Sequence, residues 1–235
     1  MLSFVSDPKF FGLVKMIFIV KAQSDSSIFA TFPVIAYTAG FLMHDTIINA
    51  LTRLVEFNEE ELFHFLKLLK PRILNKNDFI LEAGNTCNSM VIINRGGLRY
   101  YSINDKGEQS YWFAFEGEWL GDYESFLTRQ PSSHFIQAIE ATEIFSLSYN
   151  DMQRLYARGA KFERFGRLIA ENLFVKVERS RNELVSLSAE HRYLNLIKDH
   201  PNILKRVPVQ HIATYLGIQP QSLSRIRRKI ASQNS

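Results

Sequence analysis

Four polar side chains near the carboxy terminus have the types and the spacing needed to read DNA bases. They are Gln219, Gln221, Ser222 and Arg225. Glutamine can pair with the edge of adenine, and arginine can form two hydrogen bonds with guanine. We therefore predict that these residues lie on the outer face of a recognition helix, with Arg225 on a guanine.

The residues around this set predict a helix-turn-helix that would hold it in place. Ile212, Ala213 and Leu216 recur on one face of a first helix. Gly217 then supplies the left-handed residue with which the chain leaves that helix. Pro220 suits the first turn of a second helix, because its missing N–H is not needed there. On that second helix Leu223 would face back toward the first one, as would Ile226.

Positive charge is concentrated in the same part of the chain. No acidic residue follows Asp199, whereas six basic residues do: Lys205, Arg206, Arg225, Arg227, Arg228 and Lys229. The whole chain carries a formal net charge of +4, so the part before this stretch is slightly acidic. Such a localised cationic surface is typical of phosphate binding. We expect Arg227, Arg228 and Lys229 to hold the DNA backbone; the alternative is a solvated basic tail.

Composition excludes several other kinds of site. The single cysteine, Cys87, cannot form an internal disulfide or hold an iron–sulfur cluster that needs four cysteines. The six histidines form no HxH or HExxH pair, so we predict no metal site and no cofactor. A metal-dependent enzyme would need histidines clustered with carboxylates, but His134 is the only histidine in residues 72–148. We expect that the chain is not an enzyme.

Residues 1–43 form an atypical apolar extension. The runs 10–20 and 28–43 are apolar, but the second is 16 residues long and contains Pro33 and Gly40. It is short for a membrane-spanning helix, and a signal peptide fits poorly. A natural start at Met43 would explain the extension as a start-site artefact. The alternatives are a genuine additional segment or a membrane anchor.

The next segment predicts helices followed by a barrel. Residues 44–69 have helical periodicity, with Asn58 as a cap and Pro71 as a stop. Residues 72–148 instead alternate short β-rich runs with glycine-containing turns, which predicts a sandwich or barrel. The strands expected are Phe79–Leu81, Met90–Ile93, Leu98–Ile103, Ser110–Phe115, Phe135–Ala138 and Glu143–Leu147. The clearest hairpin turn lies at 104–107.

A long helix is predicted from Asn150, as its cap, to Leu187. Phe162, Phe165 and Ile169 begin an apolar stripe along it. We expect this stripe to pack on the same helix of a second subunit rather than on the barrel. Ser188 would cap a further helix over 189–198.

In this order, the elements resemble those of the Crp/Fnr family of transcription regulators. The resemblance rests on WFAFEGEWLGDYESFL (112–127), SAEHRYLNLI (188–197) and VPVQHIATYLGIQPQSLSRIRRK (207–229). It implies an α+β fold: a double-stranded β-helix (jelly-roll, cyclic-nucleotide-binding-like) barrel, a long dimerisation helix and a C-terminal helical helix-turn-helix domain. After the extension of 1–43, the domains would be the sensor at 44–155, the connecting helix at 156–187 and the DNA-binding domain at 188–235.

The resemblance also places a candidate effector pocket. In cyclic-nucleotide binders of the family, a Gly-Glu pair contacts the ribose, and the arginine of an Arg-Ser-Ala triplet pairs with the phosphate. Gly121 and Asp122 stand at the first pair, and Ser132, Ser133 and His134 at the triplet. The arginine is absent, and a buried phosphate without a cation is poorly solvated. The remaining candidates for this pocket are Tyr123 and, as a substitute cation, Arg129.

Two residue types in this region have plainer interpretations. Asp122 and Glu124 could contact a ligand, but we expect helix capping. The aromatic residues Trp112, Phe113, Phe115 and Trp119 could line a pocket, but we expect core packing.

These observations predict a sequence-specific DNA-binding regulator, cytoplasmic and homodimeric. Its expected partners are double-stranded DNA, a second copy, RNA polymerase and a small-molecule effector of unknown identity that is not cyclic AMP. An alternative is a small-molecule-binding sensor whose DNA-binding output is degenerate.

Overall fold

The computed structural model describes residues 14–16, 36–38, 41–43 and 45–233. Short strands β1 (Val14–Met16), β2 (Ala36–Thr38) and β3 (Phe41–Met43) form an antiparallel sheet in the order β1-β2-β3. The rest of the apolar extension lies outside the described residues. None of the helices that the structure describes is long and apolar enough to cross a membrane.

Two helices precede the barrel, α1 (Asp45–Thr52) and α2 (Glu59–Leu68). The predicted cap at Asn58 is confirmed. Its side chain accepts from the N–H of Glu61, whose carboxylate accepts from the N–H of Asn58, each at 2.8 Å. This reciprocal capping box satisfies amides that the helix itself cannot pair.

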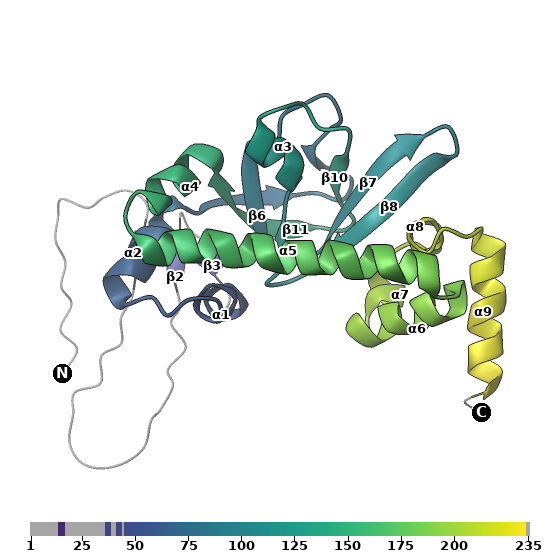
Figure 1. Cartoon of the computed structure of the whole chain (residues 1–235). Helices are drawn as coiled ribbons and strands as arrows, with labels where there is room; N and C mark the ends of the chain where they lie inside the picture. Colours follow the sequence, from purple (N-terminus) through teal and green to yellow (C-terminus); the bar gives the residue numbers. More distant parts are fainter. Residues whose placement is uncertain (1–13, 17–35, 39–40, 44, 234–235) are drawn as a thin grey trace, which may run out of the picture.

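The barrel consists of two four-stranded antiparallel sheets (Figure 1). One has the order β5-β10-β7-β8, and the other β4-β11-β6-β9. Their bounds are β4 Lys70–Leu74, β5 Phe79–Leu81, β6 Ser89–Arg95, β7 Leu98–Asn104, β8 Gly107–Ala114, β9 Trp119–Leu120, β10 Phe135–Ala138 and β11 Thr142–Ser148. The six predicted strands are confirmed, as is the hairpin turn between Asn104 and Gly107. β4 and β9 were not expected: Pro71 lies in β4, an edge strand, where a missing N–H is tolerated.

The long helical segment is divided in two. α4 (Tyr149–Tyr156) is capped by Ser148, whose hydroxyl accepts from the N–H of Asp151, so the predicted cap at Asn150 is wrong. After a break at 157–159, α5 (Ala160–Ser186) continues for 27 residues. Figure 1 shows α5 running along the barrel and on to the C-terminal domain.

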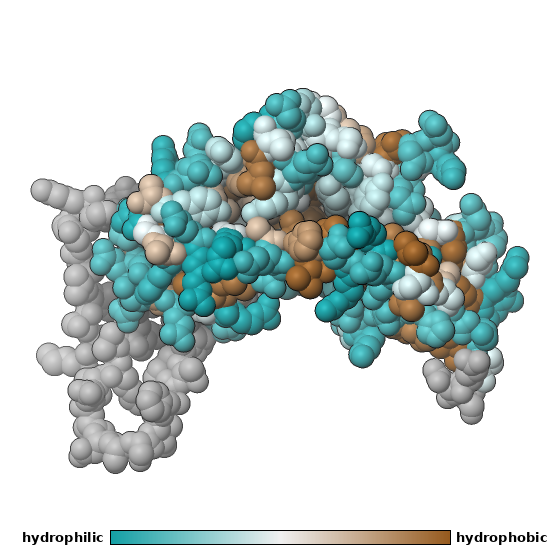
Figure 2. Space-filling view, viewed as in Figure 1, coloured by the Kyte–Doolittle hydropathy of each residue, from teal (hydrophilic) through white to brown (hydrophobic). Residues whose placement is uncertain are grey.

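The two halves of α5 have different surroundings. Phe162, Phe165 and Ile169 are buried in the main core beneath the barrel, so the expectation that they pack on a second subunit is wrong. Phe162 packs on Phe57, with 5.3 Å between ring centroids, and Phe165 packs on Phe65 at 4.9 Å. Both side chains of α5 are therefore covered by residues of the same chain. The carboxy-terminal half instead leaves large apolar side chains exposed. Figure 2 shows hydrophobic atoms along the middle and right-hand part of this helix.

The C-terminal domain contains α6 (Ala189–Asp199), α7 (Ile203–Arg206), α8 (Val209–Tyr215) and α9 (Pro220–Gln233). Ser188 caps α6 by accepting from the N–H of His191, as predicted. Gly217 has φ +66°, the left-handed conformation expected between α8 and α9. The main core fills the barrel and extends to α1, α2, α4 and the start of α5. A second cluster joins the C-terminal domain to Phe113, Phe115 and Ile139 of the barrel.

Candidate nucleic-acid interface and sensor site

The helix-turn-helix is assembled from α8 and α9 as the sequence predicts. Ile212, Ala213, Leu216 and Leu223 are fully buried between the helices, and Ile226 is half-buried beside them. Because these side chains fix the roll of α9, the opposite face of that helix points into solvent. Figure 1 shows α9 at the edge of the molecule, away from the barrel.

The side chains predicted to read bases lie at the start of α9. Gln219, Gln221 and Arg225 are exposed, whereas Ser222 is half-buried. This placement is the one expected of a recognition helix, whose first turns would meet the base edges. Contact with DNA by these residues stays a prediction.

The cations predicted to hold phosphates differ in their surroundings. Arg227 and Arg228 are exposed and line an open depression of about 390 Å³ with Ser224 and Ala231. Lys229 instead forms an ion pair with Glu190 of α6, with Nζ 2.7 Å from Oε2. A phosphate at Lys229 would therefore have to compete with a carboxylate of the same domain.

The candidate effector pocket is closed by hydrogen bonds within the protein. Asp122 caps α3 (Tyr123–Thr128) by accepting from the N–H of Ser125 at 3.1 Å. It also accepts from the hydroxyl of Ser132, and its Oδ2 lies 3.5 Å from Nδ1 of His134. Burial opposes ionisation of Asp122, but the hydrogen bonds from His134, Ser132 and Ser125 outweigh it and lower its pKa to about 2. The capping role expected for Asp122 is confirmed, whereas Glu124 lies exposed in the first turn of α3.

His134 occupies the end of the triplet and packs against aromatic rings. Its imidazole stacks on Tyr100 at 4.6 Å between ring centroids and meets Tyr111 edge-on at 5.4 Å. Burial raises the pKa of Tyr100 far above its usual range. Ser133 is exposed beside it, with its hydroxyl 3.3 Å from Nδ1 of His134. The structure thus brings Asp122, Ser132 and His134 together.

The remaining candidates of this pocket have structural roles. Arg129 donates to the carbonyl oxygens of Cys87 at 2.9 Å and Phe126 at 3.1 Å, and its guanidinium lies over the ring of Tyr149 at 4.5 Å. For Arg129 to replace the missing phosphate-binding arginine, it would have to give up these contacts, so its role in ligand binding stays a prediction. Tyr123 stacks on Phe126.

Gly121 is explained by packing rather than by a ligand. A Cβ at this position would collide with the thioether of Met90. The glycine therefore allows close approach of two barrel segments. Among the residues that the structure describes, no three His, Cys, Asp or Glu side chains are grouped so that they could hold a metal ion.

A contact between the two domains was not foreseen from the sequence. The hydroxyls of Ser110 in β8 and Thr214 in α8 lie 2.8 Å apart, and Gln109 donates from Nε2 to the carbonyl oxygen of Thr214. Phe113, expected in the barrel core, points outward and packs against Tyr215 at 5.7 Å. Phe115 is buried in the same outer cluster. Trp112 and Trp119 do pack against the main core, as expected.

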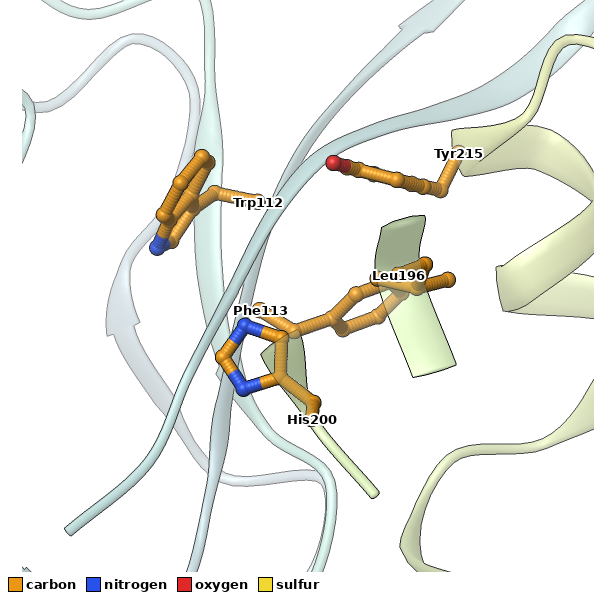
Figure 3. A pocket seen from close by; sticks show the side chains of 5 residues that line it. All are labelled: Trp112, Phe113, Leu196, His200 and Tyr215. Carbon is orange, nitrogen blue, oxygen red and sulfur yellow. The ribbon is translucent and has the colours of Figure 1, made fainter. Parts of the chain in front are cut away.

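A small void remains within this contact. Figure 3 shows Trp112, Phe113, Leu196, His200 and Tyr215 around it. Its volume of about 10 Å³ is about the least that a single water molecule needs. The seam between the domains is thus closed but imperfectly packed.

The comparisons with known proteins agree with this architecture. Residues 71–158, which contain most of the barrel, match the family described as cyclic nucleotide-binding domain. No curated protein sequence matches the chain.

Solved structures extend the likeness to the C-terminal helices. FixK2 from Bradyrhizobium japonicum is 14% identical with a TM-score of 0.63, over 71% of this chain and 86% of that one. CLP from Xanthomonas campestris, described as a c-di-GMP responsive global regulator, is 16% identical with a TM-score of 0.60, over 75% and 93%. The catabolite activator protein of Thermus thermophilus is 19% identical with a TM-score of 0.50, over 79% and 88%. The resemblance to Crp/Fnr regulators is therefore confirmed at the level of the fold.

Proposed function

We propose that this protein is a DNA-binding transcription regulator of the Crp/Fnr type, in which the barrel controls a helix-turn-helix. The observation that carries the proposal is the start of α9. Gln219, Gln221 and Arg225 are exposed to solvent there, on the side opposite the buried contact between α8 and α9. Arg225 would pair with guanine, while Arg227 and Arg228 bind phosphates without reading sequence.

The exposed half of α5 supports a homodimer. Phe174, Val177, Leu184 and Val185 share one face of the helix and are 67%, 55%, 50% and 87% exposed. Large apolar side chains at this spacing suit packing on the same helix of a second copy. A dimer would present two α9 helices to successive major grooves, about 34–36 Å apart.

The sensor site supports an effector other than cyclic AMP. Ser132 and His134 stand where the family's phosphate-binding triplet falls, and both are bonded to Asp122. A cyclic phosphate would meet this carboxylate rather than an arginine, which is unfavourable. CLP, which shares the fold, is described as c-di-GMP responsive. CLP is thus an example of a regulator with this fold whose described effector is not cyclic AMP.

The alternative of a sensor with a degenerate DNA-binding domain has less support. A degenerate domain would be expected to lose its packing or its outward polar set. Here Leu216 and Leu223 are fully buried, and α9 keeps its exposed arginines.

Selection of binding sites from a random duplex pool, followed by two arginine variants, tests the function. The selected sites should form a pseudo-palindrome. Arg225→Ala should cost about 1–3 kcal/mol on the selected site and relax one base position. Arg228→Ala is the matched control, which should weaken all sequences equally. If no sequence is enriched, or if both variants lose the same affinity on every duplex, the base-reading role is wrong.

A further inference from the structure

The first helix of the helix-turn-helix is covered on two sides. Its inner face packs on α9 through Ile212 and Ala213. Its outer face meets the barrel, where Thr214 is bonded to Ser110 and Gln109. Of its seven residues, only Gln210 is exposed to solvent. In DNA complexes of this motif the first helix crosses the phosphate backbone. In the docked arrangement, the outer face of α8 is occupied by β8 instead.

Barrel carboxylates also occupy a cation of the C-terminal domain. The guanidinium of Arg206 donates to Glu116 from Nη1 and Nη2, each at 2.8 Å, and to Glu140 from Nε at 2.9 Å. It lies over the ring of Phe115 as well, 4.4 Å from the centroid. Burial opposes ionisation of Glu116, but the hydrogen bond from Arg206 prevails and lowers its pKa. Paired carboxylates engage an arginine much as phosphate does. In the docked state, the barrel carboxylates therefore occupy the guanidinium of Arg206, which another anion could engage only after displacing them.

The rest of the contact between the domains contains a buried polar group that is incompletely hydrogen-bonded. Arg99 is 1% exposed, donates to Ser110 and Glu108, and leaves its Nη2 without a hydrogen-bond partner. An unpaired buried donor is costly, and it regains solvation when the seam opens. The water-sized void beside Tyr215 weakens the apolar part of the same contact.

From these contacts we infer that the docking of α8 and Arg206 on the barrel is an autoinhibitory latch. In the docked state the barrel holds the DNA-binding domain through groups that the DNA backbone would engage. Release of the latch exposes α8 and frees Arg206, which raises affinity for DNA. This inference rests on the proposed DNA-binding function.

A reversible crosslink tests whether the docked state is inhibited. Because the hydroxyls of Ser110 and Thr214 lie 2.8 Å apart, Ser110→Cys with Thr214→Cys should form a disulfide without large backbone movement. The full chain is tested against labelled random-sequence duplexes of about 30 base pairs at low salt, long enough for two half-sites. The oxidised double variant should bind about tenfold more weakly than its reduced form. The two single-cysteine variants, treated in the same way, should not change.

A second pair of variants opens the latch from the barrel side without altering the DNA-binding domain. Glu116→Gln with Glu140→Gln should tighten binding about fivefold. Glu56→Gln with Glu59→Gln removes the same charge from exposed sites around the start of α2, at the other end of the molecule, and corrects for general electrostatics (Figure 1).

The outcomes separate the latch from the function. Equal DNA affinity of the oxidised and reduced forms, or weaker binding after Glu116→Gln with Glu140→Gln, would show that the docked state is competent and would overturn the latch alone. Failure of both the wild type and the opened variant, Glu116→Gln with Glu140→Gln, to bind duplexes at low salt would overturn the DNA-binding function and the latch with it.

Discussion

His134 Nδ1 lies 3.5 Å from Asp122 Oδ2, at the place where the resemblance to cyclic-nucleotide binders puts a ligand. The hydroxyl of Ser132 completes the set by donating to the same carboxylate. The position at which the resemblance places a ligand is therefore filled by hydrogen bonds between side chains of the same chain. The two contacts join α3 to the segment before β10.

Asp122 is expected to make stability depend on pH in acid. Its pKa of about 2 lies below the ordinary value of 3.8, so the ionised form stabilises the folded state. This contribution, about 2 kcal/mol, is fully present above pH 3.8 and is lost as pH falls toward 2. Urea unfolding of wild type and of Asp122→Asn, which keeps the cap acceptor, should differ near neutral pH and converge in acid. A constant difference at all pH values would show that the carboxylate's charge is not responsible.

Arg129 should matter for folding rather than for an effector. Arg129→Ala removes two hydrogen bonds to carbonyl oxygens and is expected to cost about 2 kcal/mol of unfolding free energy. Because Arg129 has φ +61°, Arg129→Gly should be more stable than Arg129→Ala by about 1 kcal/mol. Chemical denaturation measures both. If Arg129→Ala is as stable as wild type but abolishes a ligand-induced melting shift, Arg129 is a ligand-binding residue.

Oligomeric state should depend on one face of α5. Phe174→Glu places a charge in the proposed interface of both subunits and should weaken the dimer by about 3 kcal/mol or more. Val175→Glu is the matched control, since Val175 is similarly exposed (54%) but lies about a quarter-turn away on the helix. Sedimentation equilibrium distinguishes the two. An equal effect of both variants, or a monomeric wild type, would remove this face from the interface.

The features foreseen from the sequence depend on neighbours along the chain. The helix cap at Asn58, the turn at Asn104–Gly107 and the left-handed Gly217 each follow from a few adjacent residues. Local backbone geometry limits which residue types can occupy such positions. The surface of α9 could be predicted for the same reason, because helical periodicity separates its buried and exposed faces.

The features that were missed depend on residues far apart in sequence. The spacing of Phe162 and Phe165 correctly predicted a helix but not what the helix packs against. The same apolar stripe suits a barrel and a second helix equally well. The contact of Ser110 with Thr214 spans 104 residues and leaves no local signal. Arg129 seemed free as a cation because nothing nearby in sequence reveals the carbonyl oxygen of Cys87.

His211 gives the seam between the domains a pH dependence. Burial, and then the positive charge of Arg99, lower its pKa to about 4, with a smaller contribution from Lys76, while Glu108 opposes them. Since this value lies below the ordinary 6.5, the docked state holds His211 neutral. Docking should be fully stable above pH 6.5 and should weaken as pH falls from there toward 4. One unit below 6.5, the docking constant is expected to fall by about tenfold.

Amide hydrogen exchange of α8 measures this opening. Wild type and His211→Gln are compared at each pH, so that the intrinsic pH dependence of exchange cancels. At about one unit below 6.5, α8 of the wild type should lose protection relative to its value near pH 7.5, whereas His211→Gln should not. The same acid-induced loss in both proteins would assign the opening to other groups, because only the imidazole distinguishes them.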